Sequence, residues 1–458
     1  MWRALLARLV DIRENEAGPM LLAAAQFFCL LFGYFMVRPL RETMGLRGGV
    51  DEVRVLFQIT IGVMIVGNLV YGRIASRVGR RALVPGVYAA VVLSLAGFLV
   101  WQQAAGEAEA RWMGRVFYVW LSVINVFTVS VFWQLLADVF TLEQSKRLFG
   151  FIGVGGTAGA ICGSSYARKL AEEIGTFGLM ASASALFLIA GSIAVLLCQT
   201  AGSRANEASG RTDDAAVGGR AWSGLTRLFR VPYLGGIGLL VLLFTIGSTL
   251  LYFEKLRIVE SAVEGDADRT ELFATIEVAG QVLTVALQVL LTGRLMKWLG
   301  IGALLAVVPL ITVLGFAALG LFPTLAVLTV FEATRRAGNF ALTKPARETL
   351  FTVVDREDKY KAKAGIDTFV YRGGDSVGTG IDALLAKAGA SVAIVAIPVG
   401  IAGAVIAGWL GARVRRLGGV GPGMHAGEGG NDRQGDGVGV CERGSKSPER
   451  ECHETVAS

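Results

Sequence analysis

The chain has 458 residues, of which 53% are hydrophobic and only 18% are charged. A soluble domain carries charge at about a quarter of its positions, so this composition excludes an ordinary water-soluble fold and favours a protein embedded in a lipid bilayer. The formal net charge of +7 does not indicate nucleic-acid binding, because Lys and Arg gather in the segments between apolar runs. Neither the five cysteines nor the two histidines show a metal-ligand spacing, so we expect no metal and no cofactor.

Apolar runs of spanning length predict about twelve transmembrane helices. In chain order they lie near 19–40, 54–72, 82–101, 114–139, 148–169, 176–198, 234–253, 272–292, 302–320, 323–343, 366–386 and 390–411. The fifth run is rich in glycine, which suits close helix packing through small residues. The sequence therefore predicts an all-α membrane protein.

A polar stretch in the middle of the chain divides the predicted spans six and six. The expected parts are a cytoplasmic N-terminal segment at 1–18, a six-helix bundle at 19–199, a cytoplasmic linker at 200–231, a second six-helix bundle at 232–412 and a disordered cytoplasmic tail at 413–458. The linker is rich in Ser, Gly, Arg and Asp, and the tail is Gly-rich without any apolar period.

Positive charge is distributed unevenly between the two sides. With the N-terminus inside, the inner segments hold more than twice as many Lys and Arg residues as the outer ones. Because positive charge resists translocation, we expect both termini in the cytoplasm of a bacterial inner (plasma) membrane. The expected environment is a lipid bilayer, with no nucleic-acid partner and a monomeric chain.

A short motif recurs after the second and eighth spans. It comprises Gly72, Arg73, Gly79 and Arg80 in the first half, and Gly293, Arg294 and Gly300 at the same offset in the second. The glycines would allow tight turns between antiparallel helices, and the arginines would bond the inner ends of neighbouring helices. The alternative is a pair of ordinary basic loops. A duplication of this kind favours two parallel repeats, related by pseudo-two-fold symmetry, with a site between them near the midplane.

The first copy of the motif, 72–81, resembles the loop signature of the major facilitator superfamily, Gly-x-x-x-Asp-Arg-x-Gly-Arg-Arg. Ser76 stands where that family usually has Asp. The resemblance implies the major facilitator fold of two six-helix bundles. The substitution at Ser76 removes the carboxylate that would latch this loop to a neighbouring helix.

Other stretches are similar to the ATP:ADP antiporter (nucleotide translocase) family and its uncharacterised bacterial relatives. They are 34–42, 132–138, 146–150 and 335–375. The family pattern Arg-x-x-Lys-Asp near the end of the first helix is matched by Arg38, whereas Arg41 and Glu42 keep only the charges of its Lys and Asp. This resemblance implies a nucleotide or another phosphorylated metabolite as the substrate.

Ionisable side chains within the predicted spans need an explanation, because each costs at least a few kcal/mol in hydrocarbon unless it is paired or hydrated. Arg38, Arg41 and Glu42 share one face at the end of the first span. They are either interfacial arginines with a partner, or a cationic cluster facing a cavity, which the family resemblance favours. Glu277, in the eighth span, is either an exposed carboxylate near the outer end or a protonatable group in an outer vestibule.

The tenth span contains Glu332, Arg335, Arg336 and Asn339. Glu332 and Arg336 are spaced to form an i, i+4 ion pair. Two adjacent arginines cannot both reach the interface, so we expect at least one to face water, a carboxylate or a substrate. A purely structural ion-pair network is the alternative.

The eleventh span contains Tyr371, Arg372 and Asp375 in a Gly-rich setting that permits close approach of a ligand or helix. Asp375 is expected to pair with Arg372 or, across helices, with Arg335 or Arg336. We interpret this region as part of the site or its gate.

The charged stretch 344–363, between the tenth and eleventh spans, has two interpretations. The simpler is a solvated, salt-bridged intracellular helix. The alternative is a gate that locks to the basic loops of the first half when the inner side closes.

Together these features predict a secondary active transporter for a small, anionic solute that works by alternating access. The expected substrate-binding residues are Arg38, Arg41, Arg335, Arg336, Asn339, Tyr371 and Arg372, and the expected coupling or gating residues are Glu42, Glu277, Glu332 and Asp375. A coupling proton or a counter-substrate is expected, since carboxylates accompany the arginines.

Two alternatives remain: a proton-coupled exporter of another small molecule, and a transport-inactive membrane scaffold. An enzyme is disfavoured, because no phosphate-binding loop, nucleophile–base constellation or metal motif is present. A transporter places Arg38, Arg336 and Asp375 around one wet cavity, whereas a scaffold buries them in closed pairs.

Overall fold

The structure is a computed structural model, and it describes the greater part of both predicted bundles. The described residues are 16–75, 77, 80–104, 106–205, 231–354, 363 and 365–418. Most of the predicted N-terminal segment, linker and tail lies outside these residues, as do Ser76 and Gly79 of the loop motif.

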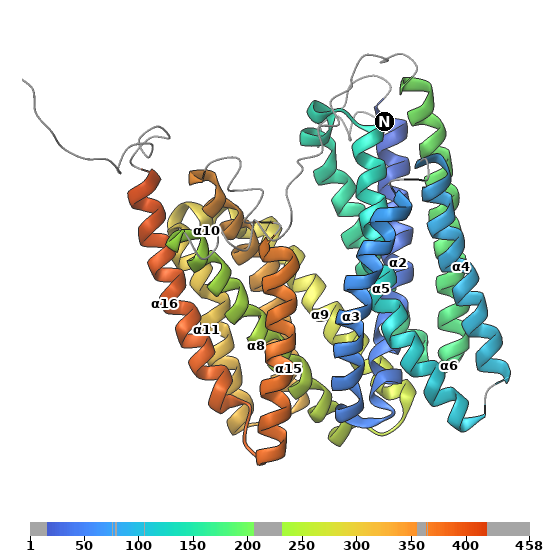
Figure 1. The fold of residues 1–458 in the computed structure, drawn as a ribbon. Helices are drawn as coiled ribbons and strands as arrows, with labels where there is room; N and C mark the ends of the chain where they lie inside the picture. Colours follow the sequence, from blue (N-terminus) through green and yellow to red (C-terminus); the bar gives the residue numbers. More distant parts are fainter. Residues whose placement is uncertain are drawn as a thin grey trace, which may run out of the picture.

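The first half of the chain forms a bundle of long helices. They are α2 (Ala17–Leu46), α3 (Gly49–Ala75), α4 (Arg80–Ala104), α5 (Glu107–Val139) and α6 (Leu142–Ala205). A straight α6 would measure roughly 96 Å at 1.5 Å per residue, about three times the thickness of a hydrocarbon core. The backbone of Gly175 leaves the helical region (φ 60°, ψ −169°), so α6 divides into two legs that run in opposite directions (Figure 1). These legs correspond to the predicted fifth and sixth spans.

The second half forms a bundle of shorter segments. In order they are α8 (Pro232–Ala262), α9 (Asp266–Leu290), α10 (Thr292–Trp298), α11 (Gly300–Leu321), α12 (Leu325–Gly338), a π-helical turn (Asn339–Thr343), α13 (Lys344–Leu350), a 3-10 turn (Phe351–Val353), a second π-helical turn (Ile366–Val370), α15 (Tyr371–Ala388) and α16 (Ala393–Gly418). The predicted tenth span thus ends in a π-helical turn, and the predicted eleventh span begins with one. Eight helical stretches of the described chain are long and apolar enough to cross a membrane, and one of them contains both legs of α6.

Helix packing in the first bundle depends on glycine. Gly155, Gly159 and Gly163 lie on one face of α6, and a Cβ at any of them would come within 2.5 Å of a carbonyl oxygen of α2. Two backbones can approach this closely only where a side chain is missing. The predicted role of the Gly-rich fifth span is therefore confirmed.

The loop motif behaves differently from its predicted role as a pair of turns. Gly72 lies within α3 and Gly293 within α10, so neither forms a turn, and the expectation for these two is wrong. The turn between α10 and α11 is formed by Gly300, whose φ of +73° favours glycine. Arg73 and Arg294 are exposed.

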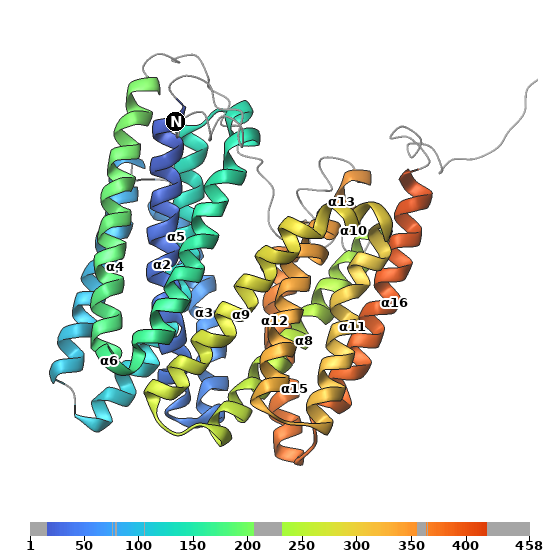
Figure 2. The same ribbon diagram turned by 180° about the vertical axis from the view of Figure 1, so that it is seen from behind.

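The two bundles meet at one end of the molecule and diverge at the other (Figures 1 and 2). Helix α2 begins, α6 ends and α16 ends on the diverging side. On the outer faces, large apolar side chains such as Leu93, Leu314 and Val405 are about 70% exposed, which suits contact with lipid.

Candidate functional site

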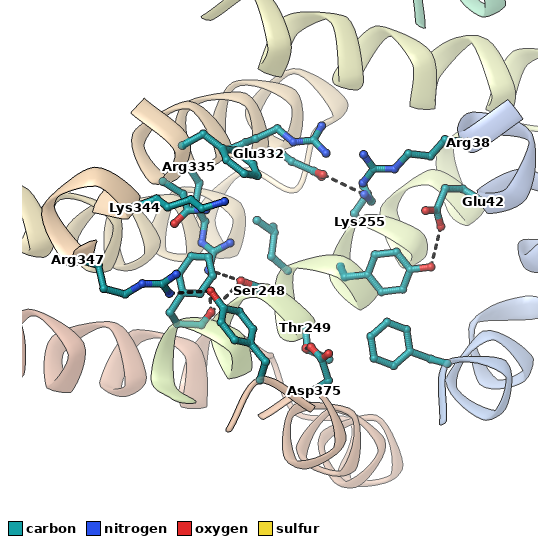
Figure 3. A pocket seen from close by; sticks show the side chains of 18 of the residues that line it. Arg38, Glu42, Ser248, Thr249, Lys255, Glu332, Arg335, Lys344, Arg347 and Asp375 are labelled. Carbon is teal, nitrogen blue, oxygen red and sulfur yellow. Dashed lines mark hydrogen bonds and ion pairs between the residues drawn. The ribbon is translucent and has the colours of Figure 1, made fainter. Parts of the chain in front are cut away.

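A cavity of about 770 Å³ lies between the bundles (Figure 3). Its walls come from α2, α3, α8, α12, the turn Asn339–Thr343, α13 and α15. Eight basic side chains line it, namely Arg38, Arg41, Lys255, Arg335, Arg336, Lys344, Arg347 and Lys363, against four acidic ones, Glu42, Glu332, Glu348 and Asp375. Positive charge is therefore in excess, and the partner of each cation decides which charges a ligand can use.

Arg41 of α2 is neutralised by its neighbour in the chain. Its Nη2 lies 2.6 Å from Oε1 of Glu42, its Nη1 donates to Oγ of Ser122 at 2.8 Å, and its guanidinium lies over the ring of Tyr118. Glu42 also accepts a hydrogen bond from the hydroxyl of Tyr252 at 2.6 Å, which joins α2 to α8 of the other bundle. These predicted residues line the cavity, but their charges largely satisfy one another.

Glu277 of α9 joins two arginines from different bundles. It lies 3.1 Å from Nη1 of Arg38 on α2, and its other oxygen accepts a hydrogen bond from Arg336 on α12. Glu277 is only 6% exposed, so the alternative of an exposed carboxylate is wrong. The predicted ion pair between Glu332 and Arg336 does not form either, because α12 directs Arg336 towards Glu277.

Glu332 pairs instead with Lys255, a residue that the sequence pattern did not single out. The Nζ of Lys255 lies 3.0 Å from Oε1 of Glu332. The predicted seventh span ends at Phe253, but α8 continues to Ala262 and carries Lys255 into the cavity. The spacing of Tyr252 and Lys255, three residues apart, was the available signal that they share a helix face.

Asp375 of α15 pairs with Arg372 of its own helix, which is one of the two pairings predicted for it. Nη1 of Arg372 donates to Oδ2 of Asp375 at 3.3 Å, and the hydroxyl of Thr249 on α8 donates to Oδ1 at 3.2 Å. Asp375 and Tyr371 line the cavity, whereas Arg372 does not. The inter-helix alternative, Asp375 with Arg335 or Arg336, is not formed.

Arg335 is the most unusual cation of the site. It is only 7% exposed, and its guanidinium donates solely to neutral oxygens: Nε to Thr312 Oγ1 at 3.0 Å, and Nη2 to Ser248 Oγ at 2.8 Å and to the carbonyl of Phe244 at 3.1 Å. The ring of Phe244 lies 4.9 Å from its Cζ. Within the described residues no carboxylate pairs with Arg335. A buried cation is normally paired with an anion, and Arg335 departs from this rule in the described part of the chain.

Another wall of the cavity comes from α13. Nη1 of Arg347 donates to the hydroxyl of Tyr371 at 2.8 Å, and Lys344 lies over the ring of Phe340 at 5.6 Å. Lys363 pairs with Glu348 at 2.7 Å. The beginning of 344–363 is a helix with an exposed Lys344 and an ion pair, as in the simpler interpretation, and it also forms a wall of the cavity. Residues 355–362 lie outside the described part.

Where the bundles meet, further polar contacts join them. Helix α2 contacts α9 through Arg47 and Asp266 and through Thr43 and Thr270. A second set is centred on a fully buried carboxylate, Asp382 of α15, which lies 2.7 Å from Arg54 of α3 and 2.8 Å from Arg257 of α8. We call these two sets of contacts the inter-bundle seam.

Asn339 completes the predicted set. It lines the cavity one turn beyond Arg335, at the start of the π-helical turn. Six of the seven predicted binding residues thus lie around one cavity, Arg372 being outside it. In the described chain no group of His, Cys, Asp and Glu is arranged to hold a metal ion.

The comparisons with known proteins bear on the fold. No protein-family description and no curated protein sequence matches the chain. Among solved structures it is similar to an auto-inhibited peptide transporter of the POT family (TM-score 0.61, 13% identity, 87% of this chain and 97% of that one). It is also similar to the POT family transporter PepTSo (0.62, 12%, 88% and 98%) and to the nucleoside transporter NupG (0.55, 13%, 87% and 98%).

The similarity covers nearly the whole length of these structures, and at such low identity it concerns the fold alone. The similarity does not single out the ATP:ADP antiporter family. The chain is an all-α, multi-pass membrane protein with the fold of major facilitator transporters.

Proposed function

We propose that this protein is a secondary transporter that moves a small organic anion across the membrane by alternating access. The observation that carries the proposal is the cavity between the bundles, in which basic side chains outnumber acidic ones and Arg335 is buried without a carboxylate partner among the described residues. Guanidinium groups present a planar fork of donors that suits phosphate and carboxylate.

The arrangement of the bundles supports the alternating-access part of the proposal. The inter-bundle seam joins the bundles at one end of the molecule, while the bundles diverge at the other end (Figure 2). Under the expected topology the diverging end faces the cytoplasm, so this is an inward-facing state. Rocking of the bundles would have to break the seam and close the cytoplasmic end.

Glu277 is proposed as the gating carboxylate. It links Arg38 of the first bundle to Arg336 of the second, and both of these arginines line the cavity. A substrate anion that engages these arginines competes with Glu277 and loosens a contact between the bundles. Binding energy is thereby coupled to the conformational change, since a ligand shifts an equilibrium only by its differential affinity for the two states.

Within this class, a nucleotide or another phosphorylated metabolite is the narrower proposal. It depends on the sequence resemblance to nucleotide translocases and on the aromatic rings that line the cavity beside the cations, such as Phe244, Phe340 and Tyr371.

Arg38, Arg336 and Asp375 line one cavity, as a transporter requires, although each is also paired with an oppositely charged side chain. What favours a transporter over a transport-inactive scaffold is therefore Arg335, which lines the same cavity without a carboxylate partner among the described residues.

The test is a thermal-shift screen of the purified protein, followed by uptake into proteoliposomes. The panel contains nucleotides, sugar phosphates, organic acids and cationic drugs. We expect stabilisation by one or more anions in proportion to saturation, and uptake of the same compounds. Stabilisation by cationic drugs alone would refute the anion proposal, and binding of an anion without uptake would refute transport.

A further inference from the structure

The lining cations divide into two classes according to their partners. Arg38 and Arg336 share Glu277, while Arg41, Lys255 and Lys363 each pair with a glutamate. Among the described residues, the other three lining cations form no ion pair.

These three unpaired cations are Arg335, Lys344 and Arg347, and they belong to one continuous segment of the second bundle. Each of them lies over an aromatic ring rather than beside a carboxylate of the described chain: Phe244, Phe340 and Tyr371 respectively. Apart from the one positive charge that remains where Arg38 and Arg336 share Glu277, the unpaired cations of the cavity thus lie on α12 and α13.

The π-helical turn places these side chains on one wall. In an α-helix, a residue five positions after Asn339 would face away from it, because a turn takes 3.6 residues. The turn Asn339–Thr343 is closed by a hydrogen bond from the amide of Lys344 to the carbonyl of Asn339, five residues apart. This wider turn brings Lys344 back to the side of Arg335 and Asn339. We call Arg335, Asn339, Lys344 and Arg347 the cationic strip.

The strip has a deep end and a shallow end. Arg335 is buried between neutral partners, and its Nη1 has no hydrogen-bond partner within the described chain. Lys344 is exposed and Arg347 is half-buried. Arg335 and Lys344 are separated by roughly 14 Å of helix at 1.5 Å per residue. Their side chains also have different partners, Thr312 and Ser248 for Arg335 and the ring of Phe340 for Lys344. We therefore treat the two ends as separate anion subsites.

We propose that the transported anion is an elongated molecule with two separate anionic groups. One group binds Arg335 at the deep subsite, and the other binds Lys344 and Arg347 at the shallow subsite. Asn339, which lies between them, is the neutral hydrogen-bonding group for the middle of the ligand. This inference rests on the proposed function and adds the charge distribution of the substrate.

The experiment uses the full-length protein and measures the affinity of linear alkane bisphosphonates of graded chain length. The matched probes are alkyl monophosphonates of the same lengths. We expect one bisphosphonate length to bind at least about tenfold more tightly than its monophosphonate, because the second group adds an intramolecular contact. We also expect Arg335→Gln, and separately the double variant Lys344→Gln/Arg347→Gln, to reduce bisphosphonate affinity to the monophosphonate level.

Two controls keep the result interpretable. Lys387→Gln removes one positive charge from an exposed position of α15 outside the cavity, and it should leave all affinities unchanged. Arg335→Lys retains the buried charge and should keep part of the bisphosphonate preference, which guards against misfolding of Arg335→Gln. Equal binding of mono- and bisphosphonates at every length would overturn the two-anion inference and leave anion transport intact. Failure of every phosphonate and every anion of the screen would overturn the proposed function as well.

Discussion

Helix α2 of the first bundle and helix α12 of the second both carry two arginines and a glutamate into the cavity, but the partners of these charges differ between the two helices. On α2, Arg41 is neutralised by Glu42, and Arg38 by Glu277 of the other bundle. On α12, Arg336 shares Glu277, whereas Arg335 has only neutral partners among the described residues. The charges of α2 are thus used in contacts that join the two bundles, whereas α12 also presents to the cavity the charge of Arg335, which is unpaired within the described chain. Four substitutions test this difference.

The largest effect is expected for Glu277→Gln. It leaves Arg38 and Arg336 partly buried and without their shared carboxylate, and removing one partner of a buried ion pair costs about 3–5 kcal/mol. We expect a large fall in the midpoint of thermal unfolding in detergent. Glu348→Gln, which breaks the more exposed pair with Lys363, is the control and should change the midpoint little. Equal midpoints for the two variants would show that Glu277 does not hold the bundles together.

Arg335→Gln comes next, and it acts on binding. A hydrogen bond to a charged group contributes about 1.5–3 kcal/mol, which corresponds to roughly a 10- to 150-fold loss of affinity. We expect this loss for the anion that the screen identifies. The paired cation Arg41, changed together with its partner as Arg41→Gln/Glu42→Gln, should cost less affinity. The comparison between α2 and α12 fails if the double variant loses more affinity than Arg335→Gln.

Asp375→Asn should separate binding from transport. Asp375 is paired within its own helix and with Thr249, so it is not a contact for an anion, and we expect substrate affinity to stay within about threefold. If Asp375 gates the cavity, uptake into proteoliposomes is lost while the protein still reaches the membrane. Normal uptake by this variant would remove Asp375 from the gating residues.

The smallest effect is expected for Arg347→Lys. The change keeps the positive charge at the shallow subsite but replaces the planar fork that donates to Tyr371. Because Arg347 is only half-buried, we expect an affinity loss of about three- to fivefold, measured with the same anion as for Arg335→Gln. A loss as large as that of Arg335→Gln would place the main anion contact at the shallow end.

Much of the fold could be predicted from the sequence, because a bilayer imposes a length and an apolar composition on every spanning helix. The Gly-rich fifth span also predicted close helix packing, and the structure shows α2 as the partner, at Gly155, Gly159 and Gly163 of α6. Prediction was poorer at the loop motif, where Gly72 and Gly293 proved to be helical. It was also poorer at the end of α8, where Lys255 lies beyond the apolar run but still within the helix.

The candidate site shows most clearly which features the sequence predicts and which depend on the tertiary structure. Sequence alone marked Arg335 and Arg336 as unusual, since two adjacent charges in an apolar span are costly. It could not assign their partners, because adjacent residues of an α-helix point about 100° apart and so meet different neighbours. Only the tertiary structure directs Arg336 to Glu277, leaves Arg335 among neutral oxygens, and turns Lys344 into the cavity through a π-helical turn. Hydrophobic periodicity determines which segments enter the membrane, whereas packing between segments far apart in the chain decides which charges remain available to a ligand.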